Sequence, residues 1–389
     1  MIKRRAEFPN NISFFLFGPR GTGKSSLIKE RYPNSIYIDL LESETYRRLL
    51  AKPERISEYL FNNQEQPIII DEIQRIPSLL NEVHRLIESE KLNFILTGSN
   101  ARKLKATQAN LLAGRALKYN LFPLNISEVG DSVLLSEVLK FGLLPTIYDE
   151  NKSIDSIKYL QSYVQIYLEE EIMQEGLTRN LGDFSRFLEI ASFSQGQQLN
   201  ISEVAREASI NRKVAESYFH ILYDLLIAYE LPVFKKRAKR KLISQNKFYF
   251  FDVGVYSTIK PKGFLDRIEN EEGILYESLV MQEIMALNSY MNSKYEISYW
   301  RTKSGVEVDF VLYGENKLIT IEVKRKENLS ESDLIGLRTF KIDYPMAEQF
   351  VFYGGNKTLK LEGITAIPIK EALLNLENIL TEEWPRKHK

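Results

Sequence analysis

The sequence predicts a multidomain α/β protein on three observations. The chain has 389 residues, which at about 150 residues per domain corresponds to two or three domains. Near the amino end, a glycine-rich loop joins a short apolar run to a helical segment, the order of elements in an α/β unit. Near the carboxyl end, a long amphipathic helix precedes two strand-like segments, which indicates a second α/β domain.

The composition excludes several kinds of site. Lysine plus arginine and aspartate plus glutamate both number 52, so a nucleic-acid site would have to be a local patch. The chain has no cysteine and only three histidines, which excludes disulfides and leaves little for a zinc cluster or a Ser-His-Asp triad. No apolar run approaches the ~20 residues of a membrane span. We therefore expect a soluble cytoplasmic protein that does not contact a membrane.

The glycine-rich loop has the phosphate-binding pattern GxxxxGK(S/T). The apolar run at residues 12–18 would be a buried strand leading into it, and SLIKERY would be the following helix. Backbone N–H groups of such a loop surround phosphate oxygens, and the helix dipole favours the same anion. Lys24 would reach the β- and γ-phosphates, and the Ser25 hydroxyl would bind Mg²⁺. The expected contacts of ATP are Gly18, Pro19, Arg20, Gly21, Thr22, Gly23, Lys24, Ser25 and Ser26.

A second strand should supply the acidic groups of this site. Residues 67–73 read PIIIDEI, so Asp71 would join the Mg²⁺ site and Glu72 would be the general base for the attacking water. A third strand, at residues 93–100, would place Ser99 or Asn100 where it senses the γ-phosphate. The alternatives are a core strand that ends in exposed acids and a polar strand end without a role.

Four motifs carry a resemblance to a known family. They are GPRGTGKSS, IIIDEIQRIP, FILTGSN and LAGRALKYNLFPL, and in this order they resemble the AAA+-type ATPases of bacteria and archaea that carry a nuclease-like C-terminal domain. The resemblance implies an ATPase core at residues 1–150. It also implies that Arg115 contacts the γ-phosphate, in cis or from a neighbouring subunit of a homo-oligomer. The alternative is a surface arginine without this role.

The middle of the chain is expected to hold two helical units. Residues 151–181 read as a helical lid, whose acidic run at 169–171 would be solvated. Residues 182–258 read as a winged helix-turn-helix, in which Ser202 would be the N-cap of one helix. The polar face of the next helix would point into a nucleic-acid groove and carries Arg212, Lys213, Ser217 and His220.

A basic run follows these helices. Six of the seven residues at 235–241 are basic and are flanked by strand-like segments, the pattern of a cationic hairpin wing. Contact with phosphates explains so dense a run, and DNA is the expected partner rather than RNA. The alternatives are a solvated charge run and a winged helix that binds protein. The basic residues are Lys235, Lys236, Arg237, Lys239, Arg240 and Lys241.

The carboxyl-terminal part carries acidic residues in apolar surroundings. Residues 273–292 read as an amphipathic helix with Glu277 on its apolar stripe, where a carboxylate is costly unless it is paired or binds a cation. Two strands follow, at 305–313 and 317–325, and the GEN between them is a turn signal. Val306, Val308, Phe310 and Leu312 would share one face of the first strand.

A hairpin that is symmetric about the bond between residues 315 and 316 would place Asp309 opposite Glu322 and Glu307 opposite Lys324. Like charges opposed on a sheet are unfavourable, and a divalent cation between them would reverse the penalty.

This arrangement resembles the PD-(D/E)XK nuclease superfamily, although Val308 stands where that motif has proline. The resemblance implies an α/β restriction-endonuclease-like domain at residues 262–389. Its metal ligands would be Glu277, Asp309 and Glu322, and Lys324 would stabilise the phosphate during catalysis. The alternative is a solvated polar face with an ordinary Glu307–Lys324 ion pair.

The sequence therefore predicts an ATPase that binds nucleic acid through a winged helix and cleaves it in a Mg²⁺-dependent reaction. The alternative is an ATP-dependent DNA-binding switch whose nuclease-like domain is inactive. The expected cofactors are ATP and Mg²⁺ in both cases.

Overall fold

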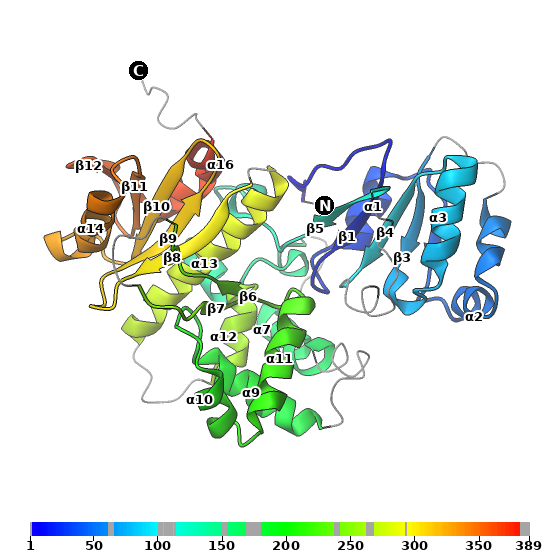
Figure 1. The fold of residues 1–389 in the computed structure, drawn as a ribbon, viewed down its shortest axis with the longest axis horizontal. Helices are drawn as coiled ribbons and strands as arrows, with labels where there is room; N and C mark the ends of the chain where they lie inside the picture. The colour runs from blue at the N-terminus through cyan, green and yellow to red at the C-terminus, as the bar shows by residue number, and fades with distance from the viewer. Residues whose placement is uncertain are drawn as a thin grey trace.

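The computed structural model describes residues 2–60, 66–99, 104, 112, 114–149, 154–168, 180–236, 242–261, 268–291 and 294–381. One sheet is formed by the amino-terminal part of the chain and a second by the carboxyl-terminal part. The two sheets lie on opposite sides of the view, and a group of helices from the middle of the chain lies below them (Figure 1). The mixed α/β fold with an amino-terminal parallel sheet agrees with the fold class predicted for that part.

The amino-terminal sheet is parallel and has the strand order β2-β3-β4-β1-β5. Helices α2 (Ser43–Ala51), η1 (Pro53–Tyr59) and α3 (Leu79–Glu90) pack on one face, and α1 (Lys24–Arg31) packs on the other. Because both faces of the central strands are buried, β1, β3 and β4 read as nearly continuous apolar runs. The strands are β1 (Ser13–Phe17), β2 (Tyr37–Asp39), β3 (Ile68–Asp71), β4 (Phe94–Gly98) and β5 (Ala116–Asn120).

The middle of the chain is helical apart from a small antiparallel sheet of two strands. Three of its helices and this sheet are the elements that a winged helix-turn-helix requires, and that identity stays a prediction. The elements are α5 (Ile126–Val129), α6 (Leu135–Phe141), η3 (Pro145–Tyr148), α7 (Ser156–Ser162), the π-helical η4 (Tyr163–Leu168), α9 (Leu181–Ser192), α10 (Ile201–Glu207), α11 (Arg212–Asp224), β6 (Ala228–Leu231), β7 (Lys247–Phe250) and α12 (Val253–Ile259).

Two details of this region differ from expectation or lie outside it. The cap of α10 is Asn200, whose side chain accepts a hydrogen bond from the backbone N–H of Glu203. The predicted cap, Ser202, lies inside the helix because the helix begins at Ile201, and asparagine caps a helix as well as serine does. The acidic run at 169–171 lies outside the described residues.

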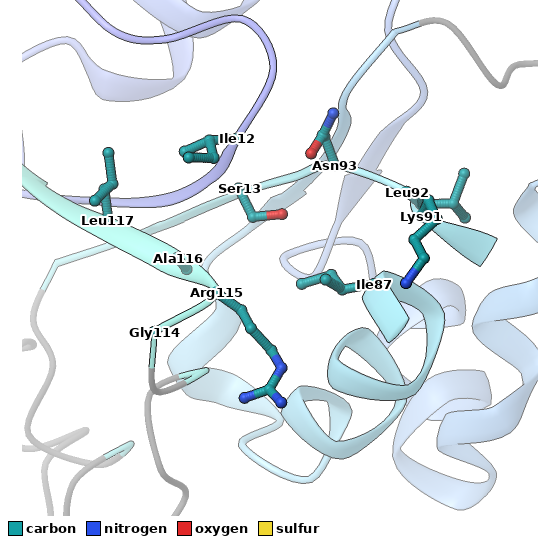
Figure 2. A pocket seen from close by; sticks show the side chains of 10 residues that line it. All are labelled: Ile12, Ser13, Ile87, Lys91, Leu92, Asn93, Gly114, Arg115, Ala116 and Leu117. Carbon is teal, nitrogen blue, oxygen red and sulfur yellow. The ribbon is translucent and has the colours of Figure 1, made fainter. Parts of the chain in front are cut away.

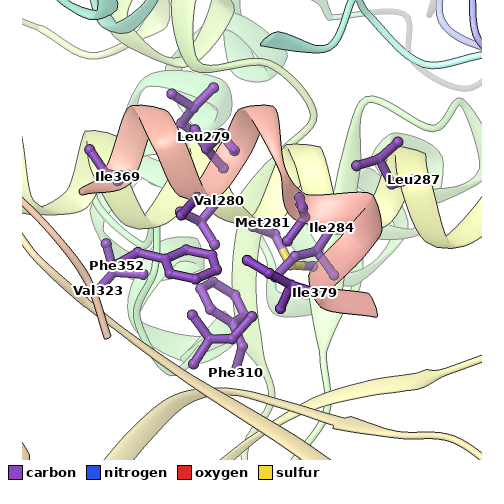
Figure 3. Packing of buried hydrophobic residues seen from close by; sticks show 14 of the residues in the cluster. Leu279, Val280, Met281, Ile284, Leu287, Phe310, Val323, Phe352, Ile369 and Ile379 are labelled. Carbon is purple, nitrogen blue, oxygen red and sulfur yellow. The ribbon is translucent and has the colours of Figure 1, made fainter. Parts of the chain in front are cut away.

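The carboxyl-terminal sheet has six strands in the order β12-β13-β11-β10-β9-β8. Helices α13 (Ile268–Tyr290), α15 (Ile369–Leu374) and α16 (Leu376–Leu380) pack on one face, where their apolar side chains meet those of the central strands (Figure 3). Helices η5 (Glu331–Leu334) and α14 (Ile335–Asp343) pack on the other. The strands are β8 (Glu296–Arg301), β9 (Glu307–Tyr313), β10 (Leu318–Lys324), β11 (Glu348–Tyr353), β12 (Leu359–Leu361) and β13 (Ile364–Pro368).

A β-bulge interrupts the alternation of side chains along β9. Val308 packs with the α14 side of the sheet, whereas Phe310 and Leu312 pack with the α13 side. The predicted single face for these residues is therefore wrong. The physical reason is the register shift in the β8–β9 pairing between Ser298 and Trp300, since a bulge adds one residue to one strand and changes the direction of its side chains.

Helix α13 also joins the two halves of the molecule. The carboxylate of Glu283 accepts hydrogen bonds from the backbone N–H of Ile126 (2.7 Å) and the side-chain amide of Asn125 (3.1 Å). Apolar residues from the segment 124–143 belong to the same core as α13. This segment, which the sequence assigns to the first domain, therefore packs against the last, and the domain boundaries stay predictions.

The buried carboxyl of Glu283 should make stability depend on pH. Burial raises its pKa from 4.5 to about 8. The folded state then binds more protons than the unfolded state in this window, so stability falls as the pH rises through it. In Glu283→Gln, the free energy of unfolding should fall less steeply with rising pH, by up to about 1.4 kcal/mol per pH unit. Urea unfolding at a series of pH values measures this slope. Glu327→Gln, at an exposed carboxyl, is the matched control, and an unchanged slope in Glu283→Gln would contradict the prediction.

Candidate functional site

The glycine-rich loop lies between the end of β1 and the start of α1, at the carboxyl edge of the parallel sheet. Gly21 and Gly23 have positive φ angles of 82° and 87°, a conformation that glycine adopts readily. A Cβ atom on Gly18 would lie 2.2 Å from the carbonyl oxygen of Leu121. The chain can follow this path only because these positions are glycine, as a phosphate-binding loop requires.

Lys24 is buried against the loop. Its Nζ donates to the carbonyl oxygens of Gly18 (2.7 Å) and Pro19 (3.1 Å), which fixes the ammonium group over the loop. Of the other predicted loop contacts, Thr22 is buried, whereas Arg20 and Ser26 are exposed. Their contact with ATP stays a prediction.

The carboxylate of Asp71, at the end of β3, accepts hydrogen bonds from three hydroxyl groups. Ser25 Oγ donates to Asp71 Oδ2 at 2.8 Å, Tyr37 donates to the same oxygen, and Thr97 donates to Oδ1. Burial and the adjacent Asp71 raise the pKa of Tyr37, so its hydroxyl keeps the proton that it donates. Ser25 and Asp71 are hard oxygen donors side by side, a set that fits Mg²⁺ bound together with substrate phosphates. Sequence reasoning missed Tyr37 and Thr97, which reach Asp71 from neighbouring strands.

Glu72 follows Asp71 in a left-handed conformation, with φ 60° and ψ 43°. The chain then forms the short 3₁₀ helix η2 (Ile73–Arg75), which brings the Gln74 side chain back to the sheet edge. Gln74 Nε2 donates to the Glu72 carboxylate and to Ser99 Oγ, the latter at 3.3 Å. The structure thus brings Glu72 and Ser99 together through a residue that sequence reasoning missed. Asn100, the alternative to Ser99, lies outside the described residues.

Two side chains from elsewhere hold the outside of the loop. Arg4 Nη1 donates to the carbonyl oxygen of Thr22 at 2.7 Å, and the Tyr163 hydroxyl donates to that of Arg20 at 2.8 Å. Arg4 Nη2 also donates to the carbonyl oxygen of Phe122 (2.7 Å) and to the hydroxyl of Tyr290 on α13 (3.3 Å). The loop is therefore bonded to the amino-terminal segment and η4, and through Arg4 to α13.

Arg115 lies at the opposite end of the sheet from the loop. It precedes β5, whose first residue pairs with Ser13 at the start of β1, whereas the loop begins after Phe17, roughly 13 Å along the strand. Its side chain pairs with Glu88 of α3 and lines a pocket at this edge (Figure 2). The predicted contact with ATP of the same chain is therefore wrong, because parallel strands place their two ends at opposite edges. A contact with ATP of a neighbouring subunit stays a prediction.

The carboxyl-terminal acids do come together. In the β9–β10 pairing, the last recorded partners are Ile321 and Phe310, which is the predicted register, and the opposition of Asp309 to Glu322 one step further stays a prediction. Asp309 Oδ2 accepts a hydrogen bond from the backbone N–H of Val323 at 2.8 Å. Burial, followed by repulsion from Glu322 and Glu277, raises the pKa of Asp309 well above its usual value.

Lys247 of β7 is the unexpected member of this cluster. Its buried Nζ lies 2.9 Å from Glu277 Oε1 and 2.5 Å from Glu307 Oε1, and the Tyr249 hydroxyl also donates to Glu277 Oε1. Burial alone would lower the pKa of Lys247, but the attractions of Glu277, Tyr249, Asp309 and Glu307 together outweigh it and the pKa is raised. The alternative ion pair of Glu307 with Lys324 is wrong, because Glu307 pairs with Lys247 and Arg301, whereas Lys324 pairs with Glu322.

These contacts bear on the predicted metal site. Lys324 pairs with Glu322, and Lys247 contacts both Glu277 and Glu307. Among the described residues, no group of three or more histidines and acids is placed to hold a metal ion. The two ammonium groups are fewer than the carboxylates of the cluster, and Glu322 Oε2 is buried without a hydrogen-bond partner among the described residues. A cation held by Glu277, Asp309 and Glu322 therefore stays a prediction.

The predicted nucleic-acid residues are described only in part. Arg212, Lys213 and Lys235 are exposed. Arg212 pairs with Glu216 at 2.9 Å, and Lys236 pairs with Glu296 at 2.7 Å. Four residues of the wing lie outside the described part of the chain, namely Arg237, Lys239, Arg240 and Lys241.

Three family models match successive parts of the chain. An AAA domain matches residues 10–130, a domain of unknown function (DUF8612) matches 133–265, and a domain of unknown function (DUF4143) matches 272–372. The amino-terminal part is therefore an AAA-type P-loop ATPase domain. The model that matches the carboxyl-terminal part has no stated function, so a nuclease fold there stays a prediction. No described helix has the length and apolar character needed to cross a membrane.

Similar proteins occur in bacteria and archaea. An uncharacterized protein of Mycobacterium tuberculosis is 27% identical over 314 residues, which cover 79% of this chain and 69% of that protein. One from Methanocaldococcus jannaschii is 24% identical over 359 residues, covering 84% and 78%. Among solved structures, the Aeropyrum pernix ORC1 protein in complex with DNA has a TM-score of 0.28 and 14% identity, covering 66% of this chain and 87% of that one. That TM-score is too low to support a structural conclusion.

Removal of the Lys247 ammonium should destabilise the protein. Lys247→Met leaves Glu277 and Glu307 without their buried cation, and breaking a buried ion pair in this way costs about 3–5 kcal/mol. Lys247→Met combined with Glu277→Gln should recover part of this loss, because one of the unpaired charges is then gone. Chemical denaturation measures both variants, and Lys213→Met, at an exposed lysine, is the matched control. A loss below about 0.5 kcal/mol in Lys247→Met, typical of a surface substitution, would contradict the assignment.

Proposed function

We propose that the protein hydrolyses ATP at its AAA domain and uses the reaction to switch its binding of nucleic acid. The observation that carries the first part is the position of Lys24 over the loop beside the Ser25–Asp71 pair, whose oxygen atoms are 2.8 Å apart. The second part rests on the exposed cations Arg212, Lys213 and Lys235. DNA is the partner we propose in preference to RNA.

The proposed reaction assigns one task to each group. Lys24 binds the β- and γ-phosphate oxygens, for which it exchanges its bonds to the loop carbonyls. Ser25 and Asp71 hold Mg²⁺, which supplies positive charge for the developing phosphate anion. Glu72 accepts the proton of the attacking water. Arg115 of a neighbouring subunit in a homo-oligomer would add a further cation at the γ-phosphate.

The contacts of the loop offer a path from ATP to the rest of the chain. A phosphate that orders the loop also acts on the carbonyl oxygens of Arg20 and Thr22, which Tyr163 and Arg4 hold from outside. Arg4 and the backbone N–H of Phe122 both contact the hydroxyl of Tyr290, the last residue of α13. We therefore propose that nucleotide state changes the position of α13 relative to the AAA domain.

Removal of the loop lysine should abolish the switch. Lys24→Ala should lower the ATP turnover at least ~100-fold, because the ammonium group stabilises charge on the transferred phosphate. It should also remove any effect of ATP on DNA affinity, measured by fluorescence anisotropy at fixed salt. Lys140→Ala, at an exposed lysine of α6, is the matched control. ATP turnover by Lys24→Ala at the wild-type rate would contradict the proposal.

Metal-dependent cleavage of nucleic acid is the second candidate function. It is favoured by the repulsion between Asp309 and the nearby Glu322, which a cation would relieve, and by Lys324, which pairs with Glu322. It is opposed by Lys247, whose ammonium group occupies the charge-balancing role that a cation would have. We therefore prefer the switch without cleavage.

A cleavage assay separates the two candidates. Under the preferred function, wild-type protein with Mg²⁺, ATP and a panel of DNA and RNA substrates yields no nicks, and Asp309→Ala leaves ATP turnover and DNA affinity within twofold of wild type. Nicks that wild type produces and Asp309→Ala does not would instead establish the nuclease.

A further inference from the structure

Gln74 occupies a special place at the carboxyl edge of the AAA sheet. Its side chain is 7% exposed and lies over the last residue of β4, since a Cβ atom on Gly98 would come within 2.3 Å of Gln74 Oε1. Strand β4 stands between β3, which ends at Asp71, and β1, which leads into the loop. The amide of Gln74 thus lies between the acidic residues and the strand that carries the phosphate-binding loop.

The contacts of Gln74 fix the orientation of its amide. Nε2 donates to the Glu72 carboxylate and to Ser99 Oγ. An ionised carboxylate can only accept hydrogen bonds, so the NH₂ end of the amide must face Glu72. The carbonyl end must then face away from Glu72, toward Gly98.

That carbonyl oxygen is buried and has no hydrogen-bond partner among the described residues. A buried acceptor without a partner is unfavourable, and such groups in native proteins generally have a functional or structural reason. Here two acceptors, the Glu72 carboxylate and Gln74 Oε1, belong to side chains joined by a hydrogen bond at the edge where the γ-phosphate of bound ATP would lie.

We infer that Gln74 positions the Glu72 carboxylate for the attacking water through its Nε2 hydrogen bond, an inference that rests on ATP hydrolysis as the proposed function. A water molecule that donates one O–H to Glu72 keeps a lone pair free to attack the γ-phosphorus. Its oxygen forms the new bond to phosphorus while the bond from phosphorus to the β–γ bridging oxygen breaks. One proton passes to Glu72, the other remains on the phosphate product, and ADP leaves with the bridging oxygen.

The bond from Gln74 Nε2 to Glu72 is the contact through which Gln74 acts. It prevents the Glu72 side chain from turning away from the sheet edge, to which the left-handed backbone at Glu72 directs it. Loss of Gln74 should therefore slow the chemical step and leave ATP binding, which depends on the loop and Lys24, largely intact.

Gln74→Met tests this assignment, because methionine fills the space over Gly98 and makes no comparable hydrogen bond. The measurements are single-turnover hydrolysis and the Kd of a fluorescent ATP analogue, with Gln197→Met at an exposed position as the matched control. Gln74→Met should lower the single-turnover rate at least ~10-fold and change Kd less than twofold. Gln74→Glu keeps an acceptor and loses the donor to Glu72, so it should also lower the rate and leave Kd unchanged. This variant replaces Gln74→Met if the methionine variant does not fold.

The outcomes distinguish the inference from the proposed function. Wild type that shows no more turnover than Lys24→Ala would overturn both. Turnover by wild type that is undiminished in Gln74→Met and Gln74→Glu would overturn only the role of Gln74. A Kd that weakens by the same factor as the rate would also overturn it, because Gln74 would then act in binding.

Discussion

The carboxyl-terminal domain depends on the buried ammonium group of Lys247. This group contacts Glu277 on α13 and Glu307 on β9, and its charge also acts on Asp309. Without it, these carboxylates would repel one another in surroundings that solvate charge poorly. Since Lys247 begins β7, the same contacts fasten the two-stranded sheet of the middle region to the last domain.

The two acidic sites of the chain differ in how their charge is balanced. In the AAA domain, Asp71 is surrounded by neutral hydroxyl donors, so the site retains a negative charge that a cation can neutralise. In the carboxyl-terminal domain, Lys247 and Lys324 supply part of the positive charge that the acids require. The first site is therefore suited to acquire Mg²⁺ with a substrate, and the second is suited to hold the fold together.

Local patterns predicted most of the AAA domain and part of the last domain. The loop, its flanking strand and helix, and the acidic end of β3 are specified by short segments, so one sequence suffices to find them. The register of β9 and β10 followed from the short turn between them, because turn length fixes strand pairing. The bulge in β9 left no signal in the run of alternating residues, and it shifted the direction of Val308.

Three of the side chains that sequence reasoning missed share one property. Lys247, Arg4 and Tyr37 meet their partners across long stretches of chain, and none of them stands in a motif that names its partner. Arg115 was misplaced for a related reason. Its motif does not reveal that the strand after it runs parallel to β1, which assigns the arginine to the far edge of the sheet.

Helix α13 has a mechanical property that follows from its continuity. Glu277, near its middle, is tied to Lys247, and Tyr290, at its end, is tied to Arg4 beside the phosphate-binding loop. The 13 residue steps from Glu277 to Tyr290 span about 20 Å of unbroken helix. A continuous helix moves as a rigid unit. A displacement of Tyr290 at one end therefore tilts the helix and also displaces Glu277.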